Sequence, residues 1–110
     1  EVIVLAPYYV NYIQMIKKMH PDATHHCSAF IYGTNSEYQR SSDDGEPSGT
    51  AGMPMLNVLK KKNLSNILAI VIRYFGGIKL GAGGLVRAYS SSIVEALNSS
   101  IHMILVNEHL

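Results

Sequence analysis

The amino-acid sequence predicts an α+β domain, in which about five strands form a sheet and three helices pack mainly on one face of it. The clearest strand signal is the unbroken, β-branched apolar run 67–72, which is typical of a strand buried on both faces. The clearest helix signal is the regular recurrence of Leu85, Tyr89 and Ile93, which places them on one helix face. With 110 residues, 1–110 is expected to form a single domain.

The first half of the chain is predicted to form four of these elements. Residues 2–5 are a short apolar run and are predicted to be an outer strand, which Pro7 ends. Residues 11–19 carry apolar side chains at helical spacing. Residues 26–32 and 38–41 indicate two strands joined by a turn, so we expect a hairpin there.

The second half supplies the other helix and a last strand. A helix is expected to begin at Thr50 or Gly52, since Pro54 is tolerated in a first turn. The apolar side chains expected to face inward from this helix are Met55, Leu56 and Leu59. Residues 103–106 are predicted to be the last strand.

Eight of the nine glycines lie in two segments, an acidic turn at 42–52 and a glycine loop at 73–87. The glycine loop is expected to join a strand to a helix N-terminus, where unpaired amides and the helix dipole favour an anion such as phosphate. The residues predicted to bind phosphate or nucleic acid are Arg73, Gly76, Gly77, Lys79, Gly81, Gly83, Gly84 and Arg87, together with Lys60, Lys61 and Lys62.

A structural role for the glycine loop is an open alternative, because glycines between a strand and a helix often serve only tight turning and close packing. The standard phosphate signatures are absent. The dinucleotide-binding pattern requires a glycine where Val86 stands, and the chain has no Gly-Lys-Ser/Thr triplet. The lysine triplet at 60–62 likewise suits the C-terminal end of a helix by its charge alone.

The acidic turn places three carboxylates, Asp43, Asp44 and Glu46, within four residues and facing the predicted site. Such a cluster could hold a hard cation such as Mg²⁺. We favour structural roles, in which the carboxylates cap the following helix, bond loop amides or pair with Arg73 or Arg87. No metal site and no cofactor are therefore predicted.

The run His25-His26-Cys27 raises the question of a metal site or a nucleophile. In a strand, His25 and Cys27 share a side and His26 points to the other, so the three do not converge on one ion. A small buried cysteine with histidines bonded to neighbouring loops is preferred. No catalytic residue is assigned, because Cys27 would need a histidine to activate it.

Charge is distributed unevenly along the chain, although the net charge is only +1. Residues 1–50 carry three basic and six acidic side chains, whereas residues 51–110 carry six basic and two acidic ones. If the six cations share a face, they form a surface suited to a phosphate backbone. A single cysteine, with neither a signal peptide nor a long apolar span, indicates a cytoplasmic protein without a membrane partner.

Three motifs together resemble one known family. They are His25-His26-Cys27, the acidic run 43–52 with 54–56, and the run 71–89 through the glycine loop. Their order and length resemble the N-terminal domain of the IMPACT proteins and their bacterial YigZ-like relatives. The resemblance implies a fold like that of ribosomal protein S5 domain 2. It also implies a fragment or short form, since many YigZ-like proteins carry a further, ferredoxin-like C-terminal domain.

Three functions are compatible with these features. The favoured one is a non-enzymatic module that binds RNA or the ribosome in the regulation of translation. The second, implied by the resemblance to eukaryotic members, is a regulator of the stress-responsive initiation-factor kinase pathway that binds a protein partner through Tyr74, Phe75 and their neighbours. The third is a small metal-dependent phosphate-ester enzyme. The sequence leaves the oligomeric state open.

Overall fold

The computed structural model describes residues 2–74, 79–99 and 104–105 and confirms an α+β fold. The elements, in chain order, are α1 (Val2–Met19), β1 (His25–Tyr32), β2 (Tyr38–Ser42), α2 (Gly52–Lys61), β3 (Ile67–Arg73), α3 (Gly81–Ser99) and β4 (Ile104–Leu105). The helix predicted to begin at Thr50 or Gly52 is confirmed, and α2 begins at Gly52. The helix predicted to follow the glycine loop is also confirmed, but α3 already begins at Gly81, so the second half of the predicted loop is helical.

The strands form one antiparallel sheet in the order β2-β1-β3-β4. The predicted hairpin is confirmed, with Tyr32 opposite Tyr38 across its turn. The two inner strands pair along the whole of β3, from His25 opposite Arg73 to Ile31 opposite Ile67. The last predicted strand is confirmed for Ile104 and Leu105, while Met103 and Val106 lie outside the described residues.

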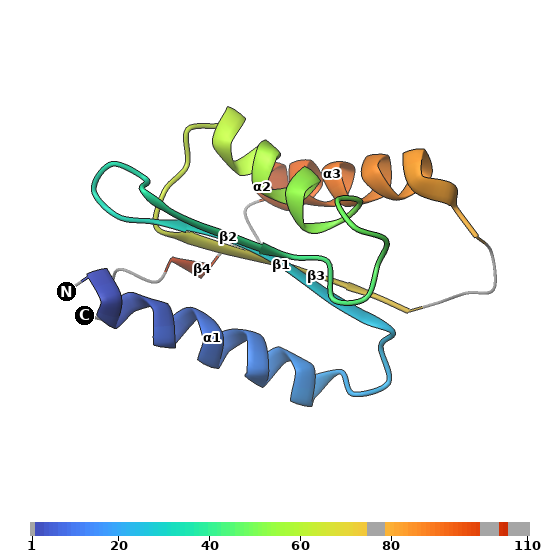
Figure 1. Ribbon diagram of the computed structural model, residues 1–110, viewed down its shortest axis with the longest axis horizontal. Coiled ribbons are helices and arrows are strands. Elements are labelled where there is room, and N and C mark those ends of the chain that lie inside the picture. Colours follow the sequence, from blue (N-terminus) through green and yellow to red (C-terminus); the bar gives the residue numbers. More distant parts are fainter. Residues whose placement is uncertain (1, 75–78, 100–103, 106–110) are drawn as a thin grey trace.

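The helices cover both faces of the sheet, so the prediction that they pack mainly on one face is wrong. Figure 1 shows α2 and α3 together on one face and α1 on the other. The inner strands are apolar on both sides, because alternate residues of β3 belong to two separate cores. Each face therefore requires a helix layer to exclude water.

The prediction of an outer strand at residues 2–5 is also wrong, because these residues belong to α1 and Pro7 lies within the helix. The described sheet consequently has four strands instead of about five. A short apolar run has no periodicity that separates a strand from a buried helix segment. One long-range contact that holds α1 against the sheet is made by the ring of Tyr9, which stacks on Phe30 with ring centroids 4.5 Å apart.

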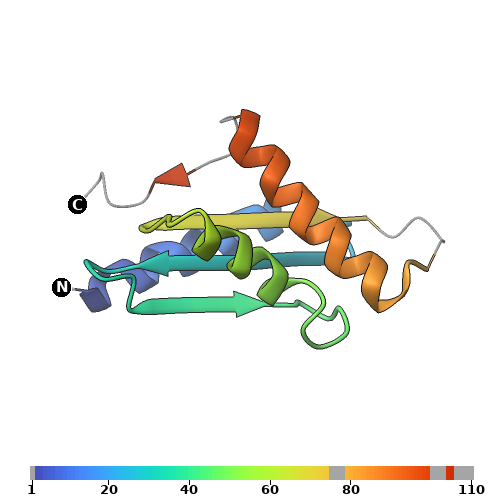
Figure 2. The same ribbon diagram turned by 90° about the horizontal axis from the view of Figure 1, so that it is seen from above.

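The larger core lies between the sheet and the pair α2 and α3. Figure 2 shows α3 crossing the sheet obliquely beside α2. The predicted inward-facing side chains are buried in this core: Met55, Leu56, Leu59, Leu85, Tyr89 and Ile93. Because β3 and α3 are both held by this core, Arg73 and the residues at the start of α3 lie beside Glu46 and Pro47 of the acidic turn that precedes α2.

Candidate anion-binding site

Asp43 organises the acidic turn through hydrogen bonds from backbone amides. Its carboxylate accepts from the amides of Gly49 at 2.9 Å, Ala51 at 3.1 Å and Gly52 at 2.8 Å. Since α2 begins at Gly52 and Ala51 makes no side-chain cap, Asp43 satisfies donors that the start of the helix leaves free. The predicted structural role of this carboxylate, as a helix cap and a partner of loop amides, is confirmed.

The backbone of the acidic turn needs glycine for two different physical reasons. Gly49 has a φ of +80°, in the left-handed region that side chains disfavour. Gly52 has an ordinary φ, but a Cβ there would lie 2.7 Å from the backbone nitrogen of Ser42. The glycines at these positions are thus explained by turning and by close packing.

Asp44 connects the turn to the first residues of β1. Its carboxylate accepts from the amide of His26 at 2.6 Å, and its carbonyl accepts from Nδ1–H of His25 at 2.8 Å. Nε2–H of His26 donates instead to the carbonyl of His20, at 2.7 Å. The expectation that the two histidines point to opposite sides and bond neighbouring loops is confirmed.

Glu46 is the most buried carboxylate of the turn, with its side chain only 2% exposed. It pairs with Arg73 through two hydrogen bonds, from Nε at 2.6 Å and from Nη2 at 3.0 Å. The hydroxyl of Tyr89 donates to the same carboxylate. Of the two arginines predicted as partners of the acidic turn, the one that pairs with Glu46 is Arg73.

All three carboxyl groups of the acidic turn have a lowered pKa. Burial alone would raise the pKa of each, but the hydrogen bonds they accept outweigh it, so that the pKa of Asp43, Asp44 and Glu46 lies below its usual range. The pKa of Asp43 is lowered by hydrogen bonds from backbone amides. The pKa of Asp44 is lowered by the hydrogen bond from the His26 amide and by the charge of Lys17. The pKa of Glu46 is lowered chiefly by the hydrogen bonds from Arg73 and Tyr89. All three are therefore ionised at neutral pH.

Cys27 lies beneath this network and is fully buried. The Cys27 sulfur lies 3.1 Å from the carbonyl oxygen of Asp43 and 3.4 Å from the Tyr89 hydroxyl oxygen, so these two atoms are the acceptors within reach of its single proton. Burial raises the pKa of the Cys27 thiol to about 11. The thiol is thus protonated and serves packing, in agreement with the structural role expected from the sequence.

The described residues contain no group of three or more His, Cys, Asp or Glu side chains that could hold a metal ion. The oxygens of Asp43 are occupied by amides, and those of Glu46 by Arg73 and Tyr89. The arrangement therefore favours the structural interpretation of the acidic turn over the Mg²⁺ interpretation.

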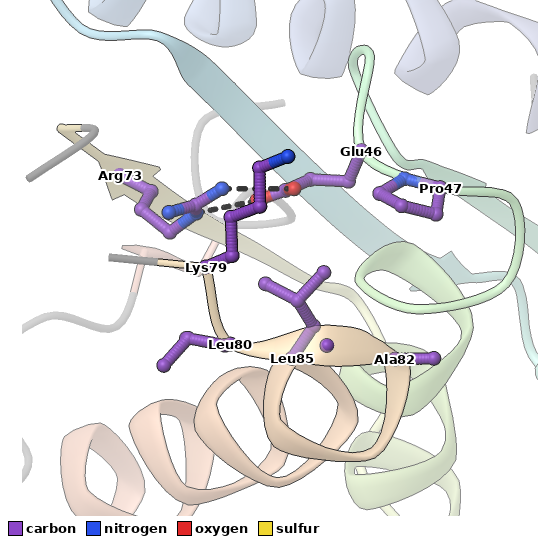
Figure 3. Close-up of a pocket in the computed structure, with 8 residues that line it drawn as sticks. Glu46, Pro47, Arg73, Lys79, Leu80, Ala82 and Leu85 are labelled. Atoms are coloured by element: carbon purple, nitrogen blue, oxygen red, sulfur yellow. Dashed lines mark hydrogen bonds and ion pairs between the residues drawn. The ribbon is translucent and has the colours of Figure 1, made fainter. Parts of the chain in front are cut away.

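A pocket of about 270 Å³ opens between the acidic turn and the start of α3. Its lining residues are Glu46, Pro47, Arg73, Lys79, Leu80, Gly81, Ala82 and Leu85. Figure 3 shows the Lys79 side chain reaching from the glycine loop toward the Glu46–Arg73 pair, with Leu85 pointing into the same space from α3. The pocket thus combines cationic groups with an apolar wall.

The structure brings together only some of the predicted phosphate-binding residues. Arg73, Lys79 and Gly81 line the pocket, whereas Gly83, Gly84 and Arg87 lie further along α3. Gly76 and Gly77 lie outside the described residues. Lys60 lines a different hollow with Ser36 and Gln39, and Lys61 and Lys62 lie at the same end of α2. Lys61 lines another hollow together with Val86. None of the three lysines lines the pocket that contains Arg73 and Lys79.

Sequence reasoning missed several residues of the site. Tyr89 was predicted only as a core residue, yet its hydroxyl joins Glu46 to Cys27. Pro47, Leu80 and Leu85 form the apolar side of the pocket, and their neighbourhood depends on how β3, α2 and α3 pack. A usable signal existed for Tyr89 alone, because a buried tyrosine needs a hydrogen-bond partner.

The fold and the pocket define a small α+β domain with a basic, apolar-walled pocket beside a buried carboxylate–arginine pair. Residues 7–97 match the model of the Impact N-terminal domain, so the chain belongs to that family. The family resemblance seen in the sequence motifs is thereby confirmed.

Curated relatives and a solved structure agree with this assignment. The chain is 63% identical over 88 residues to the IMPACT family member YvyE of Bacillus subtilis (strain 168), covering 80% of this chain and 41% of that protein. It is 48% identical over 88 residues to the IMPACT family member YigZ of Escherichia coli (strain K12), covering 78% and 43% respectively. A structure described as the crystal structure of an hypothetical protein has a TM-score of 0.77 and 44% identity, covering 86% of this chain and 45% of that chain. The chain spans about two fifths of the length of these curated relatives.

Among the described residues, no helix has the length and apolar character that crossing a membrane requires.

Proposed function

We propose that this chain is a non-enzymatic module that binds RNA or a ribosomal RNA surface, in the regulation of cytoplasmic translation. The fold we propose for it is that of ribosomal protein S5 domain 2, as family membership implies. The observation that carries the proposal is the pocket between the acidic turn and α3, where the charged group open to solvent is the ammonium of Lys79. Glu46 shares the pocket, but Arg73 neutralises it.

The charges near the pocket favour an anionic ligand. Lys79 and Arg87 are exposed, and between Ala51 and Val94 the sequence contains no acidic residue. Exposed cations on such a surface attract the phosphate backbone of a nucleic acid and displace its counterions. A phosphate at the rim would also meet the amides of the first turn of α3, which have no partner within the helix.

The enzyme alternative receives less support from the same contacts. A metal-dependent phosphate-ester enzyme requires carboxylate oxygens free to bind a cation. In the acidic turn the oxygens of Asp43 and Glu46 are already occupied. The buried Cys27 thiol, whose pKa burial raises to about 11, is a poor nucleophile.

One observation favours a protein partner as a second candidate. Tyr74 is 54% exposed and Leu80 is 48% exposed, both near the ends of the glycine loop. Exposed aromatic and aliphatic side chains of this kind are common anchors in protein interfaces. Capture of a partner that persists after nuclease treatment would support this candidate.

The test is RNA binding measured by fluorescence anisotropy over a salt series, with short labelled RNAs and with ribosomal subunits. The variant is Lys79→Ala with Arg87→Ala, and the matched control is Lys18→Ala with Arg40→Ala, whose side chains are also exposed. We expect the first variant to weaken binding and to lower the salt slope by about 2, since each phosphate contact contributes about 1. The control is expected to retain the native slope.

Two outcomes contradict the proposal. Absence of binding to any RNA or ribosomal subunit at low salt would remove the function itself. Equal losses in the variant and in the control pair would show that binding follows overall charge and does not involve the pocket.

A further inference from the structure

A ligand that consists of phosphate alone would not use the apolar wall of the pocket. Pro47, Leu80, Ala82 and Leu85 contribute this wall. Leu80 is 48% exposed, whereas Leu85 is buried in the core of the domain. A backbone phosphate needs only surface cations, so the wall indicates a ligand with a second, apolar part.

The Arg73 guanidinium on the opposite side of the pocket is held in a fixed plane. Glu46 accepts from both Nε and Nη2, at 2.6 and 3.0 Å, which is the two-point geometry that orients a guanidinium. The Arg73 side chain remains 22% exposed. A guanidinium that is oriented in this way and partly open is suited to stack on a planar ring.

The charges of the pocket indicate the sign of the ligand. The Glu46 side chain is 2% exposed and is engaged by Arg73 and Tyr89, so it offers little negative charge to a ligand. The exposed Lys79 reaches over the same space (Figure 3). An anionic group is therefore favoured at the rim, next to a planar apolar group inside.

The volume limits how much of a ligand can enter. At about 270 Å³ the pocket lies just below the range of roughly 300–1,000 Å³ that is typical of sites for drug-sized molecules. It can admit one ring system, whereas the bases of a duplex remain stacked inside the helix and are not available to enter it.

From these four observations we infer that the pocket takes one unpaired phosphorylated nucleoside, with its base between Leu80 and Arg73 and its phosphate at Lys79. This inference rests on the proposed function and adds to it a preference for single strands. A free nucleotide and an unpaired nucleotide of an RNA share this chemistry, so both are included as probes.

The experiment compares Leu80→Ser with Val86→Ser, which also removes an exposed apolar side chain of this region but lies outside the pocket. The probes are nucleoside 5′-monophosphates, inorganic phosphate, a single-stranded RNA and the duplex of the same sequence. Methyl NMR spectra of the native chain follow Leu80 and Leu85 during each titration. Thermal unfolding of both variants verifies that they are folded.

The monophosphates are expected to shift the methyl resonances of Leu80 and Leu85 in a saturable manner, and inorganic phosphate is not. Leu80→Ser is expected to weaken the binding of the monophosphates and of the single strand about tenfold, as for the loss of an apolar contact in a pocket. The same change is expected to leave the affinity for the duplex unchanged. Val86→Ser is expected to leave the affinity for all four probes unchanged. A single strand that binds more tightly than the monophosphate identifies RNA as the source of the nucleotide, and equal affinities identify a free nucleotide.

Two results would overturn the inference, and they differ in what they imply for the proposed function. If single strand and duplex bind equally and Leu80→Ser changes neither, the pocket takes no base, while the RNA-binding function stands. If no probe binds at low salt, the inference is overturned, and the proposed function falls with it when ribosomal subunits also fail to bind.

Discussion

The acidic turn and the glycine loop face each other across one pocket, yet they use their charged side chains in opposite ways. Every carboxylate of the turn is bonded within the domain, to amides, to a histidine amide or to Arg73. On the other side, Lys79 is exposed, and so is Arg87 on the following helix. Charged groups that are bonded within the domain stabilise the fold, whereas charged groups that are exposed to water are available to a ligand.

The contrast depends on where the two segments stand relative to the core. The acidic turn crosses the end of β1 and leads into α2, so its backbone is partly buried and its amides need acceptors within the domain. Lys79 and Leu80 precede α3 at the surface, and both residues are exposed. The following predictions test this division of roles.

Acidification should reveal the largest effect, because it acts on all three carboxylates of the turn. Their pKa values in the folded chain are lowered, so their stabilisation is complete above the unfolded values and is lost as the pH falls through the folded ones. The free energy of unfolding, measured with urea, is expected to decrease between about pH 5 and pH 2. A constant value over this window would contradict the role assigned to the acidic turn.

Asp43→Ala should destabilise the domain at neutral pH more than any loss of a surface charge. The change leaves the amides of Gly49, Ala51 and Gly52 without their acceptor, and we expect a loss of about 3 kcal/mol in the free energy of unfolding. Urea denaturation measures it, with Asp22→Ala as the control because Asp22 is exposed. If both variants lost the same stability, the amide contacts would contribute nothing.

Lys79→Ala should have the smallest effect on stability. Because the side chain is exposed, the free energy of unfolding is expected to change by less than about 0.5 kcal/mol, while RNA affinity falls. Thermal and urea unfolding of the variant, compared with the native chain, measure the first quantity. A loss comparable to that of Asp43→Ala would place Lys79 in the fold and would remove the contrast between the two regions.

Much of the local structure follows from the sequence, since its signals lie within single elements. The periodic apolar face of α3, the run that forms β3 and the hairpin of β1 and β2 were all predictable. The segment 2–5 was not, because four apolar residues fit a strand and a helix equally. The helix layer on the second face also escaped prediction, because it depends on long-range packing of Tyr9 of α1 against Phe30 of β1.

For the candidate site, the sequence by itself determined which groups are present: three carboxylates, the arginine that one of them pairs with, Lys79 and the helix start after the glycine loop. Only the tertiary structure decided that Glu46 and not another carboxylate meets Arg73, that Tyr89 joins them, and that the lysine triplet lies elsewhere. The physical reason is that hydrogen bonds and pockets depend on distances between elements far apart in the chain, which packing of the core sets. Residue type and spacing, by contrast, act within one turn or one strand.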